Sequence, residues 1–184
     1  MAPTDPKKAA EPAKTEGPPQ LSDVKELIDA STFEQILEMD DDDDRDFSKG
    51  IVYGFFDQAE NTFNKIEKAI KDKKLDELSS LGHFLKGSSA TLGLTNVKDG
   101  CEKIQHYGAG KDETGAVDEP DDEVSLKNID TTLKEVKVEY AKVENFLRRL
   151  YGEDIKPVEE EAKETKETKE TKEAKPKAES KDSK

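Results

Sequence analysis

Apolar residues recur at spacings of three and four along five segments of the chain, and no segment shows the sustained alternation of apolar and polar residues typical of a β-strand. Such a seam indicates a helix with one buried face. It is longest in the last segment, where it continues without a break. The pattern predicts a short helix over about residues 32–39 and longer helices over about 46–71, 75–90, 95–108 and 126–150.

These segments predict an all-α fold. The last helix by itself could form a coiled coil with a second chain, but the other long helices offer it apolar faces within the same chain. We therefore expect an antiparallel four-helix bundle, with the short first helix lying across it as a lid. Ser31, followed three residues later by Glu34, shows the spacing of a capping box at the start of the short helix. Gly93 allows a tight turn after the third helix.

The two ends of the chain carry too few large apolar side chains to join a core. Residues 1–20 are rich in Pro, Ala and Lys, and residues 156–184 repeat a Lys-Glu-Thr triplet whose period of three matches no helical seam. This composition predicts two disordered tails. We expect one folded domain over residues 21–155.

The net charge of −14 resides in that domain. The tails carry 12 Lys against 12 Asp plus Glu, whereas residues 21–155 carry 18 Lys plus Arg against 32 acidic residues. An acidic domain is a poor binder of nucleic acid or of anionic lipid. No apolar run approaches the ~20 residues of a membrane span, and the N-terminus lacks the apolar core of a secretory signal. The single cysteine, Cys101, cannot form an internal disulfide, so we expect an intracellular protein.

The stretch LGHFLKGSSATLGL, residues 81–94, places a histidine on the outer side of its predicted helix. At about 100° per residue, His83 lies nearly opposite the apolar line, and Lys86 and Gly87 share its face one turn later. Glycine inside a helix costs about 1 kcal/mol relative to alanine. We interpret Gly87 as room for a bulky group whose negative charge Lys86 could balance, such as a phosphoryl group. The alternative interpretation is an exposed histidine with no functional role. The apolar line consists of Leu78, Leu85 and Leu92.

Other candidate sites fail simple tests. The acidic run at residues 39–47 resembles the start of an EF-hand loop, but counting from Asp40 places Arg45 where the loop needs Gly and Ile51 where it needs Glu. We interpret the run as a complement to the dipole of the next helix that could also meet a basic partner. His106 is expected to be a surface residue, because no Cys or His cluster has metal-ligand spacing. The chain also lacks a phosphate-binding loop and a kinase signature, which argues against ATP chemistry.

Three stretches together resemble the histidine-containing phosphotransfer (HPt) proteins, specifically the fungal phosphorelay intermediates. They are MDDDDDRDFSKGIVYGFFDQAENTF, LGHFLKGSSATLGL and CEKIQ, which span residues 39–105 in the family's order. The motif H-x-x-K-G-[ST] followed by S-A-x-L-G is long and therefore specific. The tails and the acidic loop at residues 110–123 lie outside the resemblance.

The resemblance implies a phosphocarrier without ATP-dependent kinase activity. Such a protein accepts a phosphoryl group on a histidine, here His83, from an aspartate of a hybrid sensor kinase receiver domain. It then passes the group to an aspartate of downstream response regulators. By the same resemblance, Lys86 would offset phosphate charge, Gly87 would admit the receiver's active site, and Gln105 would hydrogen-bond near the imidazole.

One departure from the family lies close to this site. Fungal members often carry another basic residue about one turn after the glutamine, whereas this chain has Ala109 in that region. Whether Lys111 replaces the missing cation stays open at this point.

The implied partners are the receiver domains of a hybrid histidine kinase and of response regulators. No cofactor is expected on this chain, since the Mg²⁺ would sit on the receiver. We expect the apolar side chains of Phe33, Ile36 and Phe47 to form the docking surface. The family's role further implies a monomer in the cytoplasm and nucleus that serves osmotic stress signalling. The alternative function is a helical docking module that binds receivers without transferring phosphate.

Overall fold

The computed structural model describes residues 19–41 and 44–155. Within them the regular secondary structure is helical apart from one isolated β-bridge, so the predicted all-α class is confirmed. The predicted tails, residues 1–20 and 156–184, fall almost wholly outside the described residues. A short 3₁₀ helix, η1 (Leu21–Val24), precedes α1 (Ala30–Leu37), α2 (Asp46–Lys71), α3 (Leu75–Thr91), α4 (Thr95–Gly108) and α5 (Asp122–Leu150).

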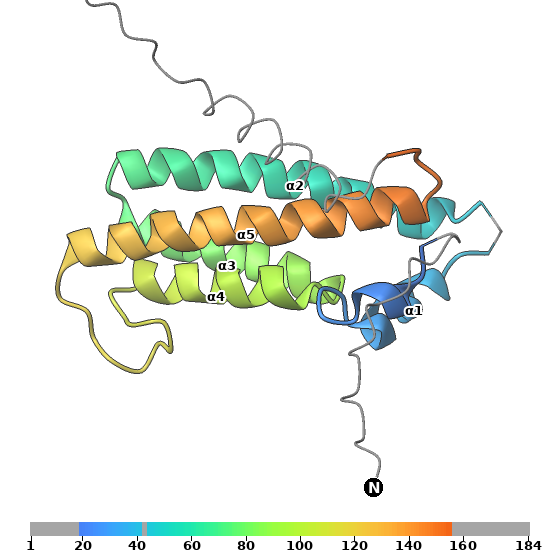
Figure 1. The fold of residues 1–184 in the computed structure, drawn as a ribbon. Helices are drawn as coiled ribbons and strands as arrows, with labels where there is room; N and C mark the ends of the chain where they lie inside the picture. The colour runs from blue at the N-terminus through green and yellow to red at the C-terminus, as the bar shows by residue number, and fades with distance from the viewer. Residues whose placement is uncertain (1–18, 42–43, 156–184) are drawn as a thin grey trace, which may run out of the picture.

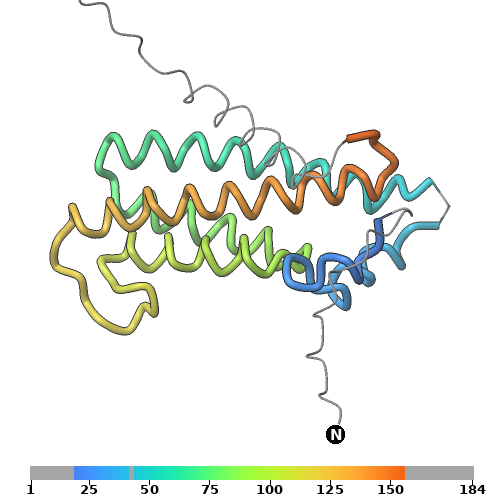
Figure 2. Tube along the Cα trace, in the orientation of Figure 1, coloured from blue at the N-terminus to red at the C-terminus, as the bar shows by residue number. Residues whose placement is uncertain are grey.

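Helices α2 to α5 form the predicted antiparallel four-helix bundle (Figure 1). Each of these helices packs against the next one along the chain, and α5 closes the bundle against α2. The tube view shows the same up-and-down course (Figure 2). The apolar seams of all four helices meet in one core, because a continuous stripe on each helix can be buried only against the others. Its largest fully buried side chains include Phe56, Ile66, Leu78, Leu85, Ile104, Ile129 and Leu147.

Helix α1 lies across the end of the bundle at which α3 turns into α4 (Figure 1). The N–H of Asp29 donates to the carbonyl of Gly93 in that turn at 2.8 Å. The expected capping box is wrong, because α1 begins at Ala30 and Asp29 is its N-cap. The carboxylate of Asp29 accepts the N–H of Ser31 at 3.1 Å, which places Ser31 inside the first turn. The helix therefore starts about two residues earlier than the pattern predicts.

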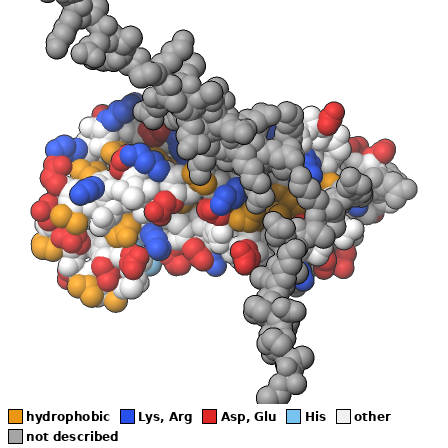
Figure 3. Space-filling view, viewed as in Figure 1, with side chains coloured by type: hydrophobic (Ala, Val, Ile, Leu, Met, Phe, Trp, Pro, Cys, Tyr) orange, Lys and Arg blue, Asp and Glu red, His pale blue; other side chains and the backbone are white. Residues whose placement is uncertain are grey.

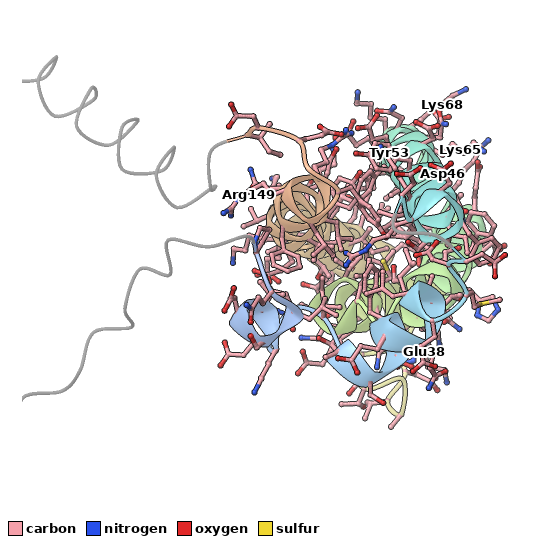
Figure 4. All side chains as sticks on the ribbon, turned by 90° about the vertical axis from the view of Figure 1, so that its right-hand side faces the viewer. Glu38, Asp46, Tyr53, Lys65, Lys68 and Arg149 are labelled. Carbon is pink, nitrogen blue, oxygen red and sulfur yellow. The ribbon has the colours of Figure 1, made fainter. Side chains whose placement is uncertain are left out.

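Large rings fill the space between α2 and α5. Tyr140 packs edge-on against Phe56 and Phe63, with ring centroids 6.2 and 5.2 Å apart. The guanidinium of Arg148 lies over the ring of Tyr53 at 5.3 Å. The view along the bundle shows Tyr53 on the side of α2 that faces α5 (Figure 4). These contacts hold α2 and α5 apart by the width of aromatic side chains.

Charged side chains of both signs are interspersed over the face of the bundle shown in Figure 3. Some of them connect helices: the ammonium of Lys137 on α5 pairs with the carboxylate of Glu67 on α2 at 2.5 Å. No helix in the described part of the chain has an apolar stretch long enough to cross a membrane.

Candidate functional site

His83 lies on the outer face of α3, as its sequence position predicts. Its side chain is exposed, whereas Leu78 and Leu85 on the opposite face are completely buried. Phe84, the next residue, is also directed outward and is 52 % exposed. The imidazole is therefore open to a partner molecule and has an aromatic ring beside it.

Gly87 leaves open space one turn after His83. A Cβ built at this position would meet no atom within 4 Å beyond its own helix and chain neighbours. No packing contact thus requires glycine here, although glycine weakens the helix by about 1 kcal/mol relative to alanine. Packing within the described part of the bundle therefore does not explain the glycine.

Gly82 and Gly108 bring the backbones of α3 and α4 into contact beside His83. A Cβ on Gly82 would lie 2.7 Å from the backbone nitrogen of Gln105, and one on Gly108 would lie 2.4 Å from the backbone nitrogen of Ser79. The Ser79 hydroxyl also donates to the Gln105 carbonyl at 2.9 Å. Ser79 therefore faces α4 instead of sharing the open face of His83.

This close approach places the backbone of Gln105 on α4 against Gly82, the residue before His83. Its side-chain Oε1 is buried and has no hydrogen-bond partner within the described residues. A buried acceptor without a partner is uncommon and destabilising. An amide oxygen of this kind can accept a hydrogen bond from an N–H donor.

Lys86 is bound to α4 through an acidic residue that sequence reasoning missed. Its ammonium lies 3.3 Å from the carboxylate of Glu102, one turn before Gln105. The antiparallel register of two helices joined by a short turn could have suggested this pairing. Lys111, the residue considered as a replacement cation, forms an ion pair with Asp118 across the β-bridge of the following loop.

The expected docking residues divide between core and surface. Phe33 and Ile36 are buried, with exposed fractions of 0 and 7 %, so the expectation that they offer an apolar docking surface is wrong. Their face of α1 is used to cover the end of the bundle. Phe47, at the start of α2, is 47 % exposed and available for contact. Sequence reasoning missed the exposed Phe84, because it follows His83 and lies off the main apolar line.

Helix α2 also carries glycines with open space around them. Gly50 and Gly54 lie one turn apart on α2, and a Cβ at either position would meet no atom within 4 Å. Farther along the helix, the amide of Gln58 donates to the hydroxyl of Ser88, the residue after Gly87. Gln58 thus connects α2 to the last turns of α3, and the two glycines lie on α2 toward its start.

One residue of the acidic run before α2, Asp40, bonds to the first turn of that helix. A carboxylate oxygen of Asp40 accepts the N–H of Ser48 at 2.8 Å in the first turn of α2. Partial burial works against the charge, but hydrogen bonds from Ser48 hold the pKa of Asp40 below its usual value. Asp46 lies in the same first turn. This placement agrees with the predicted complement to the helix dipole; residues 42–43 of the run lie outside the described ones.

His106 is partly exposed, as expected of a surface residue, and it also contacts the loop after α4. Its Nδ1 lies 2.9 Å from the carbonyl oxygen of Glu113, and a Cβ on Gly115 would lie 2.9 Å from its Nε2. The ring therefore anchors the acidic loop after α4. Across the described residues, no three His, Cys, Asp or Glu side chains are grouped so that they could hold a metal ion.

Sequence comparisons agree with this geometry. The Hpt domain family matches residues 51–145, which include the whole of α3 and α4. Multistep phosphorelay regulator 1 of Schizosaccharomyces pombe is 47 % identical over 132 residues, which cover 72 % of this chain and 45 % of that protein. The phosphorelay intermediate protein YPD1 of Saccharomyces cerevisiae is 49 % identical over 84 residues, covering 45 % of this chain and 50 % of that protein. The chain thus spans about half the length of the curated relatives it matches.

A solved structure has the same fold. Saccharomyces cerevisiae Ypd1, crystallised with the receiver domain of its downstream response regulator Ssk1, superposes with a TM-score of 0.60 and 33 % identity. That match covers 70 % of this chain and 97 % of the yeast chain. With the family match over more than half of its residues, the chain belongs to the Hpt domain family, the histidine-containing phosphotransfer proteins.

Proposed function

We propose that this protein is a phosphorelay intermediate that carries a phosphoryl group on His83. It accepts the group from an aspartate of a hybrid sensor kinase receiver domain and delivers it to an aspartate of a response regulator. The observation that carries the proposal is an exposed imidazole beside a helix glycine that no packing contact requires. Yeast Ypd1, which shares the fold, was crystallised with a receiver domain, which supports the same class of partner.

The transfer is a displacement at phosphorus. The unprotonated imidazole nitrogen of His83 provides the electron pair for a new P–N bond, while the P–O bond to the aspartate breaks and the carboxylate leaves with its electrons. The second transfer runs in the opposite direction on another receiver. Phosphoryl transfer depends mainly on positioning and charge stabilisation, so a nucleophile in a fixed, open position is sufficient on this side.

The neighbouring side chains have distinct roles in this proposal. The unpartnered Oε1 of Gln105 accepts the remaining ring N–H and so fixes which nitrogen of His83 reacts. The ammonium of Lys86 offsets the charge of the phosphoryl oxygens. Acidic groups and Mg²⁺ are supplied by the receiver, and this chain needs no cofactor and performs no ATP-dependent phosphorylation.

The docking surface in this proposal lies around Gly87. Phe47 and Phe84 provide exposed apolar contact area, and Gly87 leaves room for a receiver to reach His83. A contact of this kind depends on a few buried aromatic anchors. The carrier would meet its partners in the cytoplasm and nucleus, which a fluorescent fusion in cells would test.

The deciding experiment is phosphotransfer from a receiver domain that carries labelled aspartyl phosphate, with Mg²⁺ present. We compare the wild type with His83→Gln and use His106→Gln as a matched control, since His106 is the other histidine of the chain. Label is expected on the wild type and on His106→Gln, in an acid-labile and alkali-stable form, and none on His83→Gln. Incubation with labelled ATP alone should leave all three unlabelled.

Two results would contradict the proposal. If His83→Gln accepts label as well as the wild type, another residue is the acceptor. If neither protein accepts label while the receiver still binds, the protein is a docking module that does not transfer phosphate.

A further inference from the structure

The ammonium of Lys86 is the cation that a phosphohistidine at His83 would use, and in this structure it is paired with the carboxylate of Glu102. The side chains are 25 and 43 % exposed, and their nitrogen and oxygen lie 3.3 Å apart. Lys86 follows His83 by one helical turn, so its ammonium can reach either the imidazole or α4. One lysine therefore lies between two possible anionic partners.

Glu102 has a single described cation at bonding distance. The two other lysines of α4 near it are paired elsewhere, Lys98 with Asp99 at 3.1 Å and Lys103 with Glu113 at 3.2 Å. The backbone contact at Gly82 fixes the register of α3 against α4, which keeps Glu102 opposite Lys86. The pairing is thus a consequence of how the two helices pack.

We propose that Glu102 competes with the phosphoryl group on His83 for the ammonium of Lys86, and so lowers the stability of the phosphorylated form. Glu102 is a positioning residue in this role, since it acts through Lys86. Phosphorylation exchanges one ion pair for another, and the free protein keeps its lysine neutralised. This inference rests on the proposed function of His83 as the phosphoryl acceptor.

The competition has a functional consequence for a carrier. A carrier must release its phosphoryl group to the next receiver as readily as it accepts the group from the first. If Lys86 were free in the unphosphorylated protein, its pairing with phosphate would favour retention. The cost of breaking the Lys86 and Glu102 pair offsets part of that gain, and it is modest because both side chains are partly exposed.

The experiment measures the equilibrium constant for transfer between a phosphorylated receiver and this protein, for the wild type and for Glu102→Gln. The exchange keeps the shape of the side chain and removes its charge. We expect the equilibrium to shift roughly two- to fivefold toward phosphohistidine, the range of a partly exposed ion pair. The shift should shrink in high salt, because added ions screen the pair.

Two further variants test whether the shift in equilibrium arises from the ion pair between Lys86 and Glu102. Glu113→Gln removes a carboxylate of another α4 ion pair and should leave the equilibrium constant unchanged. In a Lys86→Met background, Glu102→Gln should leave the equilibrium constant unchanged, since the cation for which the two anions compete is absent. Circular dichroism and urea unfolding of each variant check that the bundle is retained, and Glu102→Ala serves as a second variant if Glu102→Gln does not fold.

The outcomes separate this inference from the proposed function. Labelled wild type with an unchanged equilibrium constant for Glu102→Gln overturns the competition alone. An equal shift in the Lys86→Met background also overturns it, because Glu102 would then act directly on the phosphoryl group. Wild type that takes no label from any receiver overturns the proposed function and the competition together.

Discussion

Helix α3 carries two glycines five residues apart that serve opposite purposes. A Cβ on Gly82 would strike the backbone of α4 at 2.7 Å, whereas one on Gly87 would meet nothing within 4 Å. The first glycine brings two helices together and the second keeps a surface clear. The same residue type, in the same helix, is thus a packing device on one face and an opening on the other.

The comparison teaches how the site is divided between the two faces. The seam between α3 and α4, formed at Gly82 and Gly108, positions Gln105 and Glu102 beside the His83 face. In the proposed function, the outer face, formed by His83, Phe84 and Gly87, meets the partner. Changes at the seam should therefore act on stability first, and changes at the outer face should act on transfer while leaving the fold intact.

The largest effect is expected at Gly108. Alanine here would place a Cβ 2.4 Å from the Ser79 nitrogen and 2.8 Å from its Cα, both backbone atoms that cannot turn away. We expect Gly108→Ala to lower the free energy of unfolding by about 2 to 3 kcal/mol, as overpacking does in a tight interface. Urea unfolding followed by circular dichroism measures the change. A stability equal to that of the wild type would show that the contact between α3 and α4 can accommodate an added methyl group.

Gly82→Ala should be the next most damaging change. Its Cβ would lie 2.7 Å from the Gln105 nitrogen and 2.9 Å from the Cys101 carbonyl oxygen. We expect a loss of about 1 to 2 kcal/mol, since the contacts are slightly longer and helix propensity recovers part of the cost. Phosphotransfer should also slow, because α4 would move Gln105 away from His83. Stopped-flow transfer kinetics at a temperature where the variant stays folded separate the two effects; an unchanged rate would contradict the positioning role of the seam.

Gly87→Ala should raise the free energy of unfolding, whereas the substitutions at Gly108 and Gly82 lower it. Open space and ordinary helical backbone allow alanine to stabilise the protein by about 0.5 to 1 kcal/mol. The matched comparison is with Gly82→Ala in the same helix. A larger side chain, in Gly87→Gln, should keep the stability near that of the wild type and still slow transfer by blocking the receiver. Fast transfer by Gly87→Gln would show that the opening has another purpose.

The reactivity of the Cys101 thiol should report the smallest changes in the packing of α3 against α4. Its thiol is buried in α4, and burial raises its pKa to about 12. The native protein should therefore react with a thiol reagent at pH 8 far more slowly than the urea-unfolded chain. Gly82→Ala and Gly108→Ala should react faster than the wild type, and Gly87→Ala should not. Equal reaction rates of the Cys101 thiol in all four proteins would mean that the substitutions do not loosen the contact between α3 and α4.

The same thiol gives a pH dependence with a definite sign. Its folded pKa of about 12 lies above the ordinary thiol value of about 9, so the unfolded chain loses the proton first as pH rises. The contribution of Cys101 to stability is complete below about pH 9 and is lost progressively up to about pH 12. A Cys101→Ala variant should show a weaker decline over that window.

Much of the fold followed from the sequence because helices have a simple period. Spacings of three and four located α2 to α5 within a few residues, and the leucine line of α3 placed His83 on the outside. The start of α1 was misplaced, since Asp29 and Ser31 are both good capping residues and only the local backbone decides between them.

Residue pairs across helices were harder to predict. Phe33 and Ile36 form an apolar face that could serve a partner or the core, and periodicity cannot tell the two apart. Glu102 had no local feature that marked it, because its partner Lys86 lies on another helix. His106 became an anchor for the loop after α4 through contacts that a helical pattern does not contain.

The sequence by itself determined the all-helical fold, the outward position of His83 and the neighbours one turn along α3, because a single helix fixes all of these through its own geometry. Only the tertiary structure decided that Gly82 is closed and Gly87 is open, that Phe33 is buried and Phe84 is not, and that Lys86 faces Glu102. Those properties depend on what a second helix brings to the same place, and the register between helices comes from packing that no single segment encodes.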